Sequence, residues 1–275
     1  MNDITPELAN CALKNKIWKV GGCVRDELLG HEPKDIDFVI EATEQEFEEV
    51  FPDAQKVGKD FPVYLIGGHE VALTRTEKCI GEGYQDYEIT GVGVPIEHDL
   101  LRRDFTINSI AKHVVTGAYV DPTGGREDLE QRLIRCTNPT AFAEDPLRIY
   151  RGARFAARLD FGIDIETRIM MTDNAKKLIH IKPERVEAEL QKVYAECYPG
   201  NFFKWLVNLN ALKAHFKPLE ALLHVPAGPS QYHTAEHALD HVMDVIDECK
   251  DAGLSFDCFI ACLVHDFGKA TTVPN

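Results

Sequence analysis

The sequence predicts a small α/β domain followed by a longer helical region. Short strand-like stretches separated by glycine turns are concentrated before residue 97. After that position, apolar residues recur mainly at helical spacing. With 275 residues, the chain is long enough for about two domains, each with its own core. We therefore expect a small mixed sheet with helices at the N-terminal end and helices alone beyond it.

The first elements are predicted to be a strand, a helix and a second strand. Residues 17–20 have the composition of a strand, the glycine pair after them forms a turn, and a short helix opens at Val24. A second turn over residues 30–33 leads to a strand that begins with acidic residues at Asp35. The turn and the acidic strand start are the two places in this region where chemistry is expected.

The glycine pair is a candidate phosphate site. Gly21 and Gly22 lack a Cβ, so backbone N–H groups can approach an anion, and the helix behind them adds its positive end. Arg25 would place a forked cation beside the same spot. A simple turn is the alternative, because neither the G-x-G-x-x-G fingerprint nor a Walker P-loop is present.

Asp35 and Asp37 are a candidate metal site. Side chains alternate along a strand, so both carboxylates would project from one face, with Cα atoms roughly 6–7 Å apart. That separation suits one or two Mg²⁺ ions that bridge both carboxylates and the phosphates of a nucleotide. A solvated strand edge is the alternative interpretation.

Between these motifs and residue 112 the pattern changes three times. Residues 56–66 and 70–73 predict a hairpin closed by a Gly-Gly turn. Residues 75–95 contain four glycines and many charges, which predicts a long flexible loop without a regular element. Residues 97–112 begin with acids and become apolar at helical spacing, so a helix is expected. On that helix Asp99 and Arg103 could form a surface ion pair.

Composition limits the class of protein. A formal charge of −15 is unfavourable for a nucleic-acid binder, although arginines cluster at 102–103 and at 148–158. The eight cysteines include no C-x-x-C pair, which is typical of reduced thiols in a cytoplasmic protein. No stretch reaches the roughly 18 apolar residues of a membrane helix, so no membrane partner is expected.

The order of motifs resembles the class II tRNA nucleotidyltransferase and poly(A) polymerase family. The resemblance starts with Gly-Gly-x-Val-Arg-Asp at 21–26 and Asp-x-Asp at 35–37, and continues with Arg-Arg-Asp-Phe-Thr-Ile-Asn at 102–108. The family also keeps an extended loop at 75–95 in the enzymes that add the terminal A. The resemblance implies a nucleotidyltransferase head in which Asp35 and Asp37 are catalytic Mg²⁺ ligands and Gly22, Arg25 and Arg103 contact the nucleotide.

Residues 144–158 predict a helix that carries a stripe of arginines. Asp145 before Pro146 is a helix start with Asp as the N-cap. Arginines then recur at steps of three or four, within about 120° of helix face. Since unpaired cations on one face need an anion, the stripe is a candidate anion-binding surface. A later helix from Pro183 has an ordinary apolar stripe and is interpreted as structural. The arginine stripe consists of Arg148, Arg151, Arg154 and Arg158.

Asp145 and Arg148 have the chemistry to select a base. Cytosine and adenine display an exocyclic amine where uracil and guanine display a carbonyl oxygen. A carboxylate accepts from that amine, and a guanidinium donates to cytosine N3 or adenine N1. The Glu-Asp-x-x-Arg pattern resembles the nucleotide-selecting motif of the family, which implies that Arg151 and Arg154 also bind the nucleotide. A helix cap remains the alternative role for Asp145.

Histidines near the end of the chain mark a candidate second metal site. His233, His237 and His241 fall at i, i+4 and i+8, and His265-Asp266 follows an apolar helix. His-Asp-x-Gly-Lys resembles the HD phosphohydrolase motif of bacterial HD-bearing tRNA nucleotidyltransferases. The resemblance implies a divalent transition metal on His241, His265 and Asp266. The HD pattern also needs a later Asp, so an incomplete HD region is expected.

The resemblance covers residues 17–269 and implies three parts. These are a catalytic head at 1–137, a helical neck and body at 138–225 that selects nucleotides and contacts tRNA, and the start of an HD domain at 226–275. The expected reaction is Mg²⁺-dependent addition of C, C and A to the tRNA 3′ end from CTP and ATP, with release of pyrophosphate. A poly(A) polymerase and a catalytically idle tRNA-binding protein are the alternatives.

Overall fold

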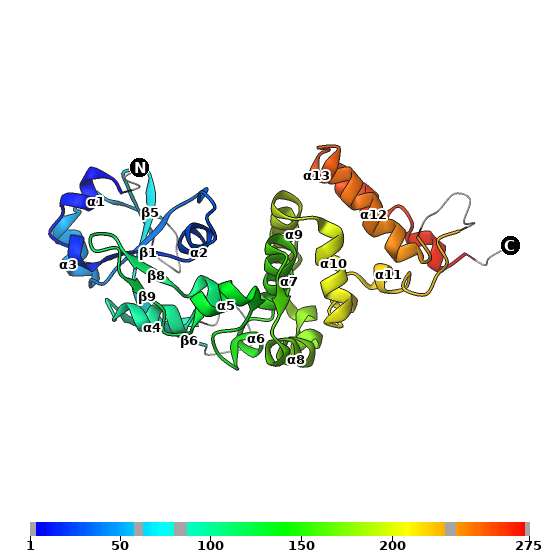
Figure 1. The fold of residues 1–275 in the computed structure, drawn as a ribbon, viewed down its shortest axis with the longest axis horizontal. Helices are drawn as coiled ribbons and strands as arrows, with labels where there is room; N and C mark the ends of the chain where they lie inside the picture. Colours follow the sequence, from blue (N-terminus) through cyan, green and yellow to red (C-terminus); the bar gives the residue numbers. More distant parts are fainter. Residues whose placement is uncertain (1–3, 58–62, 80–86, 229–234, 273–275) are drawn as a thin grey trace. The chain divides into compact units, whose positions relative to one another are not determined.

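The computed structural model describes residues 4–57, 63–79, 87–228 and 235–272 (Figure 1). The chain divides into two compact units, Met1–Glu144 and Asp145–Asn275. The first is an α/β unit and the second is mostly helical, so the predicted fold class is confirmed for the head and the helices after it. The three-part division into head, neck with body, and HD region stays a prediction.

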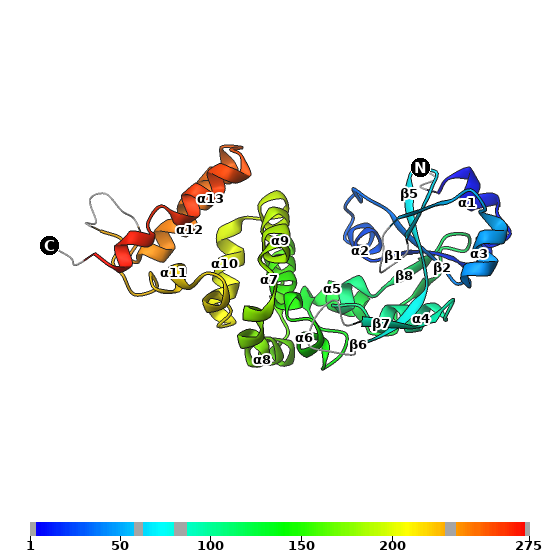
Figure 2. The ribbon, with the colours of Figure 1, turned by 180° about the vertical axis from the view of Figure 1, so that it is seen from behind.

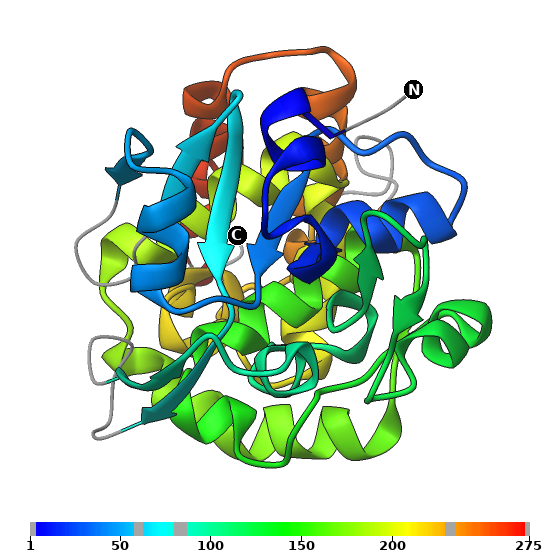
Figure 3. The same cartoon turned by 90° about the vertical axis from the view of Figure 1, so that its left-hand side faces the viewer.

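The first unit is built on a seven-stranded mixed sheet (Figure 3). Its strand order is β3-β4-β5-β2-β1-β8-β9. Strands β2 and β5 are parallel neighbours, and the other adjacent pairs are antiparallel. The strands are β1 (Ile17–Val20), β2 (Asp37–Ile40), β3 (Gln55–Val57), β4 (Val63–Ile66), β5 (His69–Leu73), β8 (Ala111–His113) and β9 (Tyr119–Val120).

Both faces of the sheet are covered by apolar clusters at the central strand β2. In β2, Phe38 and Ile40 pack with Phe47 of helix α3 in one apolar cluster. Val39 lies in a second cluster, with Leu100 of helix α4. Because side chains alternate along a strand, the apolar run of β2 supplies both clusters. The helices of this unit are α1 (Pro6–Asn10), α2 (Gly22–Leu28), α3 (Glu44–Val50), α4 (Ile96–Leu101), α5 (Gly125–Gln131) and α6 (Ala141–Glu144), and a short strand β10 spans Leu133–Ile134.

The predicted hairpin is confirmed, but the predicted loop after it is partly wrong. Strands β4 and β5 pair antiparallel, and Gly67 and Gly68 between them have positive φ. Within 75–95, β6 (Arg75–Cys79) and β7 (Tyr87–Val92) pair antiparallel, with a register shift between Thr76 and Glu77. The strands form although the stretch is rich in charges and glycine, because cross-strand hydrogen bonds stabilise them and the register shift takes up the irregular spacing. Residues 80–86 lie outside the described part.

The single helix predicted over 97–112 is wrong after Leu101. There α4 ends, a 3₁₀ turn follows at Thr106–Asn108, and β8 begins at Ala111. Phe105 has extended φ and ψ and bridges to Cys136. The backbone therefore hydrogen-bonds to a later segment of the same unit, and this tertiary pairing overrides the helical spacing.

The second unit consists mainly of helices, and each of the longer ones packs against helices close to it in chain order. Helix α7 packs against α9 and α10, α10 packs against α12, and α12 packs against α13 (Figures 1 and 2). Among the described residues, no helix is both long and apolar enough to cross a membrane. The elements are α7 (Leu147–Leu159), β11 (Gly162–Ile163), α8 (Ile165–Asn174), α9 (Pro183–Glu196), α10 (Pro199–Asn208), α11 (Lys217–Glu220), α12 (Ala238–Asp251) and α13 (Phe256–Val264).

Candidate nucleotide and metal sites

The glycine turn after β1 brings its backbone against a distant arginine. Gly21 has φ +74° and ψ −136°, a conformation that L side chains rarely adopt. A Cβ at Gly21 would lie 3.1 Å from Nη1 of Arg103. Helix α2 begins at the next residue, Gly22. The turn and the guanidinium of Arg103 are therefore direct neighbours.

Arg25 is buried inside the first unit. Its side chain is 2% exposed, Nε donates to Oδ1 of Asp26 at 2.8 Å, and Nη1 donates to Oδ1 of Asn108 at 2.8 Å. These bonds fix helix α2 to the turn at Thr106–Asn108. A guanidinium satisfied in this way reaches a phosphate only by exchanging partners, so its role as a nucleotide contact stays a prediction.

The two predicted catalytic carboxylates are exposed, and they sit differently on the chain. Asp37 is the first residue of β2, whereas Asp35 lies in a bend before that strand. The prediction that both carboxylates belong to the strand is therefore wrong for Asp35, which nevertheless acts on the pKa of Asp37. The bend after the turn at residues 30–33 delays the start of the strand, because pairing with β1 begins only where Asp37 lies opposite Val20.

A third carboxylate lies near Asp37. Strand β5 runs parallel to β2 with Val71 opposite Phe38, which places Glu70 at the same edge as Asp37. Desolvation by surrounding protein atoms raises the pKa of the Asp37 carboxyl, although its side chain is exposed, and Glu70 and Asp35 raise this pKa further. Arg103 lowers it. Carboxylate oxygens are the donors that Mg²⁺ prefers, so the chemistry of these residues fits that ion, although Asp35, Asp37 and Glu70 do not form a group of three converging ligand atoms.

Arg103 is held toward this region by Asp99. Its Nη2 and Nε donate to Oδ2 of Asp99 at 3.0 and 3.3 Å. The i,i+4 pair considered from the sequence therefore forms, but Asp99 is fully buried, so it is not a surface pair. The guanidinium of Arg103 lies beside the turn at Gly21 and acts on the pKa of Asp37.

In the second unit, Asp145 lies just before a helix and binds an arginine. Its Oδ1 accepts from the backbone N–H of Leu147, the first residue of α7, at 3.2 Å. Arg185 of α9 donates from Nη1 to Oδ1 at 3.3 Å and from Nη2 to Oδ2 at 3.0 Å. The predicted N-cap is therefore shifted by one residue: Pro146 is the N-cap of α7, and the Asp145 carboxylate reaches the first helical N–H from the residue before it. Arg185 was not expected, because the helix from Pro183 was interpreted as structural.

The expectation that the arginine stripe is unpaired is wrong for Arg154 and Arg158. Arg154 is 3% exposed, and its Nε donates to Oε1 of Glu189 at 2.6 Å. Its Nη1 also donates to Glu196, which Arg158 contacts at 3.4 Å. Both carboxylates belong to α9, which packs against α7 (Figure 2). The anion that this half of the stripe requires is therefore supplied by the protein.

Arg148 and Arg151 form the first half of the stripe and are less buried than Arg154. Arg148 and Arg151 are half-buried, and the guanidinium of Arg151 lies 5.6 Å from the ring centroid of Phe155. Arg148 follows Asp145 by one helical turn, and its backbone N–H donates to the carbonyl of Asp145 at 3.1 Å. The base-selecting pair is thus anchored at one helix start, while the roles of these residues stay predictions.

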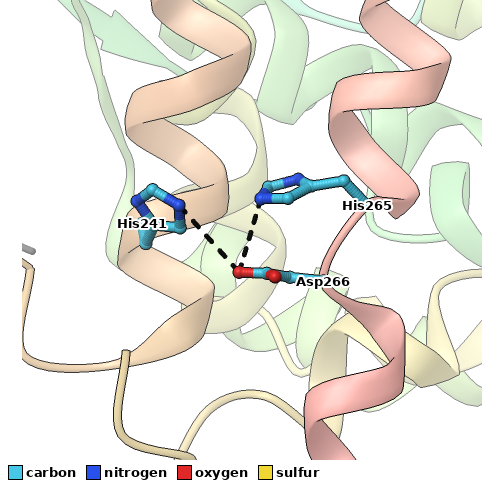
Figure 4. A group of neighbouring side chains, drawn as sticks. All are labelled: His241, His265 and Asp266. Atoms are coloured by element: carbon cyan, nitrogen blue, oxygen red, sulfur yellow. Dashed lines mark ion pairs between the residues drawn. The ribbon is translucent and has the colours of Figure 1, made fainter. Parts of the chain in front are cut away.

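His241, His265 and Asp266 converge at the end of the second unit (Figure 4). Their candidate ligand atoms lie within 4.8 Å of one another, and no other group of three such residues is found in the described part of the chain. Nε2 of His265 lies 3.4 Å, and Nε2 of His241 lies 3.9 Å, from Oδ2 of Asp266. The predicted histidine helix is wrong in part: α12 begins at Ala238, and His237 is its extended N-cap, because pairing with Pro226 keeps it out of the helix. His233 lies outside the described residues.

Comparisons with known proteins agree with this arrangement. Residues 17–135 match the poly A polymerase head domain, and residues 160–223 match the probable RNA and SrmB-binding site of polymerase A. The multifunctional CCA protein of Herminiimonas arsenicoxydans is 42% identical over 266 residues, 94% of this chain and 63% of that protein. The multifunctional CCA protein of Xanthomonas campestris is 42% identical over 273 residues, which cover 94% of this chain and 65% of that protein. The chain belongs to the tRNA nucleotidyltransferase and poly(A) polymerase family.

Solved structures show the same family fold. The Bacillus stearothermophilus CCA-adding enzyme in complex with CTP is 26% identical with a TM-score of 0.67, covering 99% of this chain and 67% of that one. The Thermotoga maritima CCA-adding enzyme complexed with tRNA is 26% identical with a TM-score of 0.67. The match covers 92% of this chain and 58% of that one. The chain spans 63–65% of the length of the first two multifunctional CCA proteins named above.

The sequence patterns did not reveal three residues near the sites, Glu70, Arg185 and Glu189. Glu70 was missed because its closeness to Asp37 depends on parallel pairing of β2 with β5. Arg185 and Glu189 were missed because an apolar stripe dominates their helix. The spacing of Asp99 to Arg103 was recognised, but not its burial. The sequence signal that could have found Arg185 and Glu189 is that both are charged residues beside the apolar stripe of their helix.

Proposed function

We propose that this chain adds C, C and A to the 3′ end of tRNA from CTP and ATP, without a nucleic-acid template and with release of pyrophosphate. One observation carries this proposal: the guanidinium of Arg103 lies beside the glycine turn at Gly21, and its charge lowers the pKa of the Asp37 carboxyl. A phosphate-binding turn, a cation and acidic residues at a strand start are the parts that nucleotidyl transfer requires. Relatives described as multifunctional CCA proteins support the choice of reaction.

In this proposal the head carries the chemistry. Asp35 and Asp37 would hold Mg²⁺, with Glu70 as an added acidic neighbour that strengthens cation binding. The bound metal would neutralise the triphosphate and activate the tRNA 3′ hydroxyl for in-line transfer. Backbone N–H groups at Gly22 and the guanidinium of Arg103 would orient the phosphates.

The second unit would select the base. Asp145 would accept from the exocyclic amine of cytosine or adenine, and Arg148 would donate to the adjacent ring nitrogen. A carboxylate has about four acceptor positions, so Asp145 can serve Leu147, Arg185 and a base at once. Arg185 would fix the carboxylate plane. Arg151 would bind the nucleotide beside them. Arg154, whose charge is already matched by glutamates, would act mainly by supporting α7.

Transfer RNA is the proposed macromolecular partner. The net charge of −15 does not oppose this assignment, because the region that matches the probable RNA-binding site carries exposed lysines. Lys176, Lys182 and Lys213 are exposed in that region. Exposed lysines can neutralise phosphates even on an acidic protein, and they make binding sensitive to salt.

We also propose that His241, His265 and Asp266 hold a divalent transition metal. Nδ1 of His265 is hydrogen-bonded to the carbonyl of Cys262 at 2.6 Å, which leaves Nε2 with a lone pair facing Asp266. Lys269 lies 2.8 Å from the same carboxylate oxygen, so a metal would compete with its ammonium group. Titration with Ni²⁺ or Co²⁺ in the wild type and in His241→Ala tests this site, and equal affinity in the two proteins would remove it.

The main test is incubation with tRNA that lacks its 3′ end and with each nucleotide separately. CTP alone should add two residues, ATP alone should add none, and both together should complete the end. Long additions from ATP alone would instead identify a poly(A) polymerase. Tight tRNA binding without any addition, at every Mg²⁺ concentration, would identify an idle binding protein.

A further inference from the structure

Asp99 occupies an unusual position for an acidic residue on a short helix. It lies in α4, a helix of six residues, and its side chain is fully buried. Its two oxygens serve different partners. Oδ2 accepts from Arg103 alone among the contacts described above, whereas Oδ1 accepts from Nη2 of Arg102 at 2.7 Å and from the backbone N–H of Arg75 at 3.2 Å. Two guanidiniums thus share one carboxylate.

The Oδ1 side leads to the base of the β6–β7 ribbon. Nε of Arg102 donates to the carbonyl of Arg75 at 3.1 Å, and Nη1 donates to Oε1 of Glu77 at 3.1 Å. Nε of Arg75 donates to the same Glu77 oxygen at 2.5 Å. The first strand of the ribbon, β6, is therefore fixed to Asp99 through a backbone bond and through Arg102.

The Oδ2 side leads to the nucleotide site. Nε and Nη2 of Arg103 are engaged by Asp99, which directs the remaining nitrogen, Nη1, to the turn at Gly21. A guanidinium held along one edge by a carboxylate has few ways to rotate, because both bonds must be kept. Its orientation toward Gly21 is then set by the position of Asp99.

We infer that Asp99 is a positioning residue: it aims Arg103 at the nucleotide site and ties that aim to the base of the β6–β7 ribbon. This deepens the proposed function and rests on it. Burial acts to raise the pKa of the Asp99 carboxyl, but Arg103, Arg102 and their hydrogen bonds lower it, so the net pKa is below the usual value and the group stays charged. Buried ion pairs contribute little net stability compared with apolar packing. A geometric role explains the burial better than stability does.

The test is a double-mutant cycle on CTP binding, measured by calorimetry without tRNA. Asp99→Asn should weaken CTP binding by about tenfold, since a charged hydrogen-bond partner of Arg103 is lost. In an Arg103→Ala background, Asp99→Asn should change the dissociation constant by less than twofold. Independent, multiplied effects of the two substitutions would overturn the proposal.

A matched control separates positioning from folding. Asp128 is another buried carboxylate of the first unit, and it contacts Arg135 at 3.1 Å and Thr106 at 2.7 Å. Asp128→Asn should lower the melting temperature without changing the affinity for CTP. If Asp99→Asn behaves in the same way, Asp99 is structural and the inference fails.

A second variant keeps the test open if Asp99→Asn does not fold. Arg102→Gln preserves the Asp99 charge but cuts the connection to Glu77, and its side chain is 21% exposed. As a single substitution, Arg102→Gln should weaken CTP binding by about threefold. Added to the Arg103→Ala variant, it should not change CTP binding. No effect in the wild type would show that the ribbon does not influence Arg103. Because CTP binding is read directly, loss of CCA addition with the cycle intact would count against the proposed function and not against Asp99.

Discussion

The two units use buried carboxylates to hold arginines, but they leave those arginines differently available. In the first unit, Asp99 engages one edge of Arg103, and Nη1 remains against the glycine turn. In the second unit, Arg154 is enclosed by Glu189 and Glu196 of another helix and is 3% exposed. Asp99 lies four residues before Arg103 in the chain and leaves one guanidinium nitrogen available, whereas the carboxylates of the facing helix α9 engage most of the Arg154 guanidinium.

This difference shows why spacing alone is a weak guide to ligand-binding arginines. Arg103 and Arg154 both occupy family motifs and both have acidic partners. Only the facing element decides whether a guanidinium edge remains for a ligand. Substitutions in both units test that contrast between the head and the arginine stripe.

The largest effect is expected in the head. Asp37→Ala should lower nucleotide addition roughly a thousandfold, because metal stabilisation is worth several kcal/mol and each 1.4 kcal/mol is about a factor of ten. The melting temperature should change little, because Asp37 is exposed. Single-turnover CMP addition measures the loss, and Asp35→Ala should behave alike. Asp53→Ala, an exposed acid of the same unit, is the control; near-normal turnover in Asp37→Ala would contradict the site.

The second prediction concerns stability in the stripe. Arg154→Ala should destabilise the protein by about 3–5 kcal/mol, because Glu189 is left buried without its partner. The double variant Arg154→Met with Glu189→Leu should recover most of that loss, since apolar packing replaces a buried ion pair. Chemical denaturation of the three proteins provides the measurement. A stable Arg154→Ala protein that no longer binds CTP would instead make Arg154 a ligand contact.

The third prediction concerns base choice. Arg185→Ala should raise the share of U and G incorporated by about tenfold, because Asp145 loses the fork that fixes its carboxylate. Asp145→Ala should do the same. If Asp145 is only a helix cap, its loss costs about 1 kcal/mol and selectivity does not change. Incorporation of all four nucleotides, with exposed Arg168→Ala as the control, distinguishes these outcomes.

The smallest effect is a difference in acid stability at Asp99. Its folded-state pKa is lowered from an unfolded value of about 3.9, so its charge stabilises the folded state fully above about pH 5. This contribution is lost as the pH falls through the lowered folded value. The stability advantage of the wild type over Asp99→Asn should therefore shrink below about pH 4. An advantage that stays constant down to pH 2 would mean that folding does not lower the pKa of Asp99.

The sequence by itself determined the features that depend on local signals. The strand at 17–20, the glycine turn, the hairpin around Gly67 and the helix from Pro183 follow from side-chain periodicity and turn chemistry, and all are present. The helix start just after Asp145 and the convergence of His241 with His265-Asp266 were also predicted. The family was recognisable because several of its motifs occur in order.

Only the tertiary structure decided which charged groups meet. Glu70 approaches Asp37 through parallel strand pairing, and α9 brings Arg185 to Asp145 and Glu189 to Arg154. The helix predicted over 97–112 ends early because its second half hydrogen-bonds to a later segment. Helical spacing defines which residues share a face, but the element packed against that face determines their partners, and this packing is set by the whole fold.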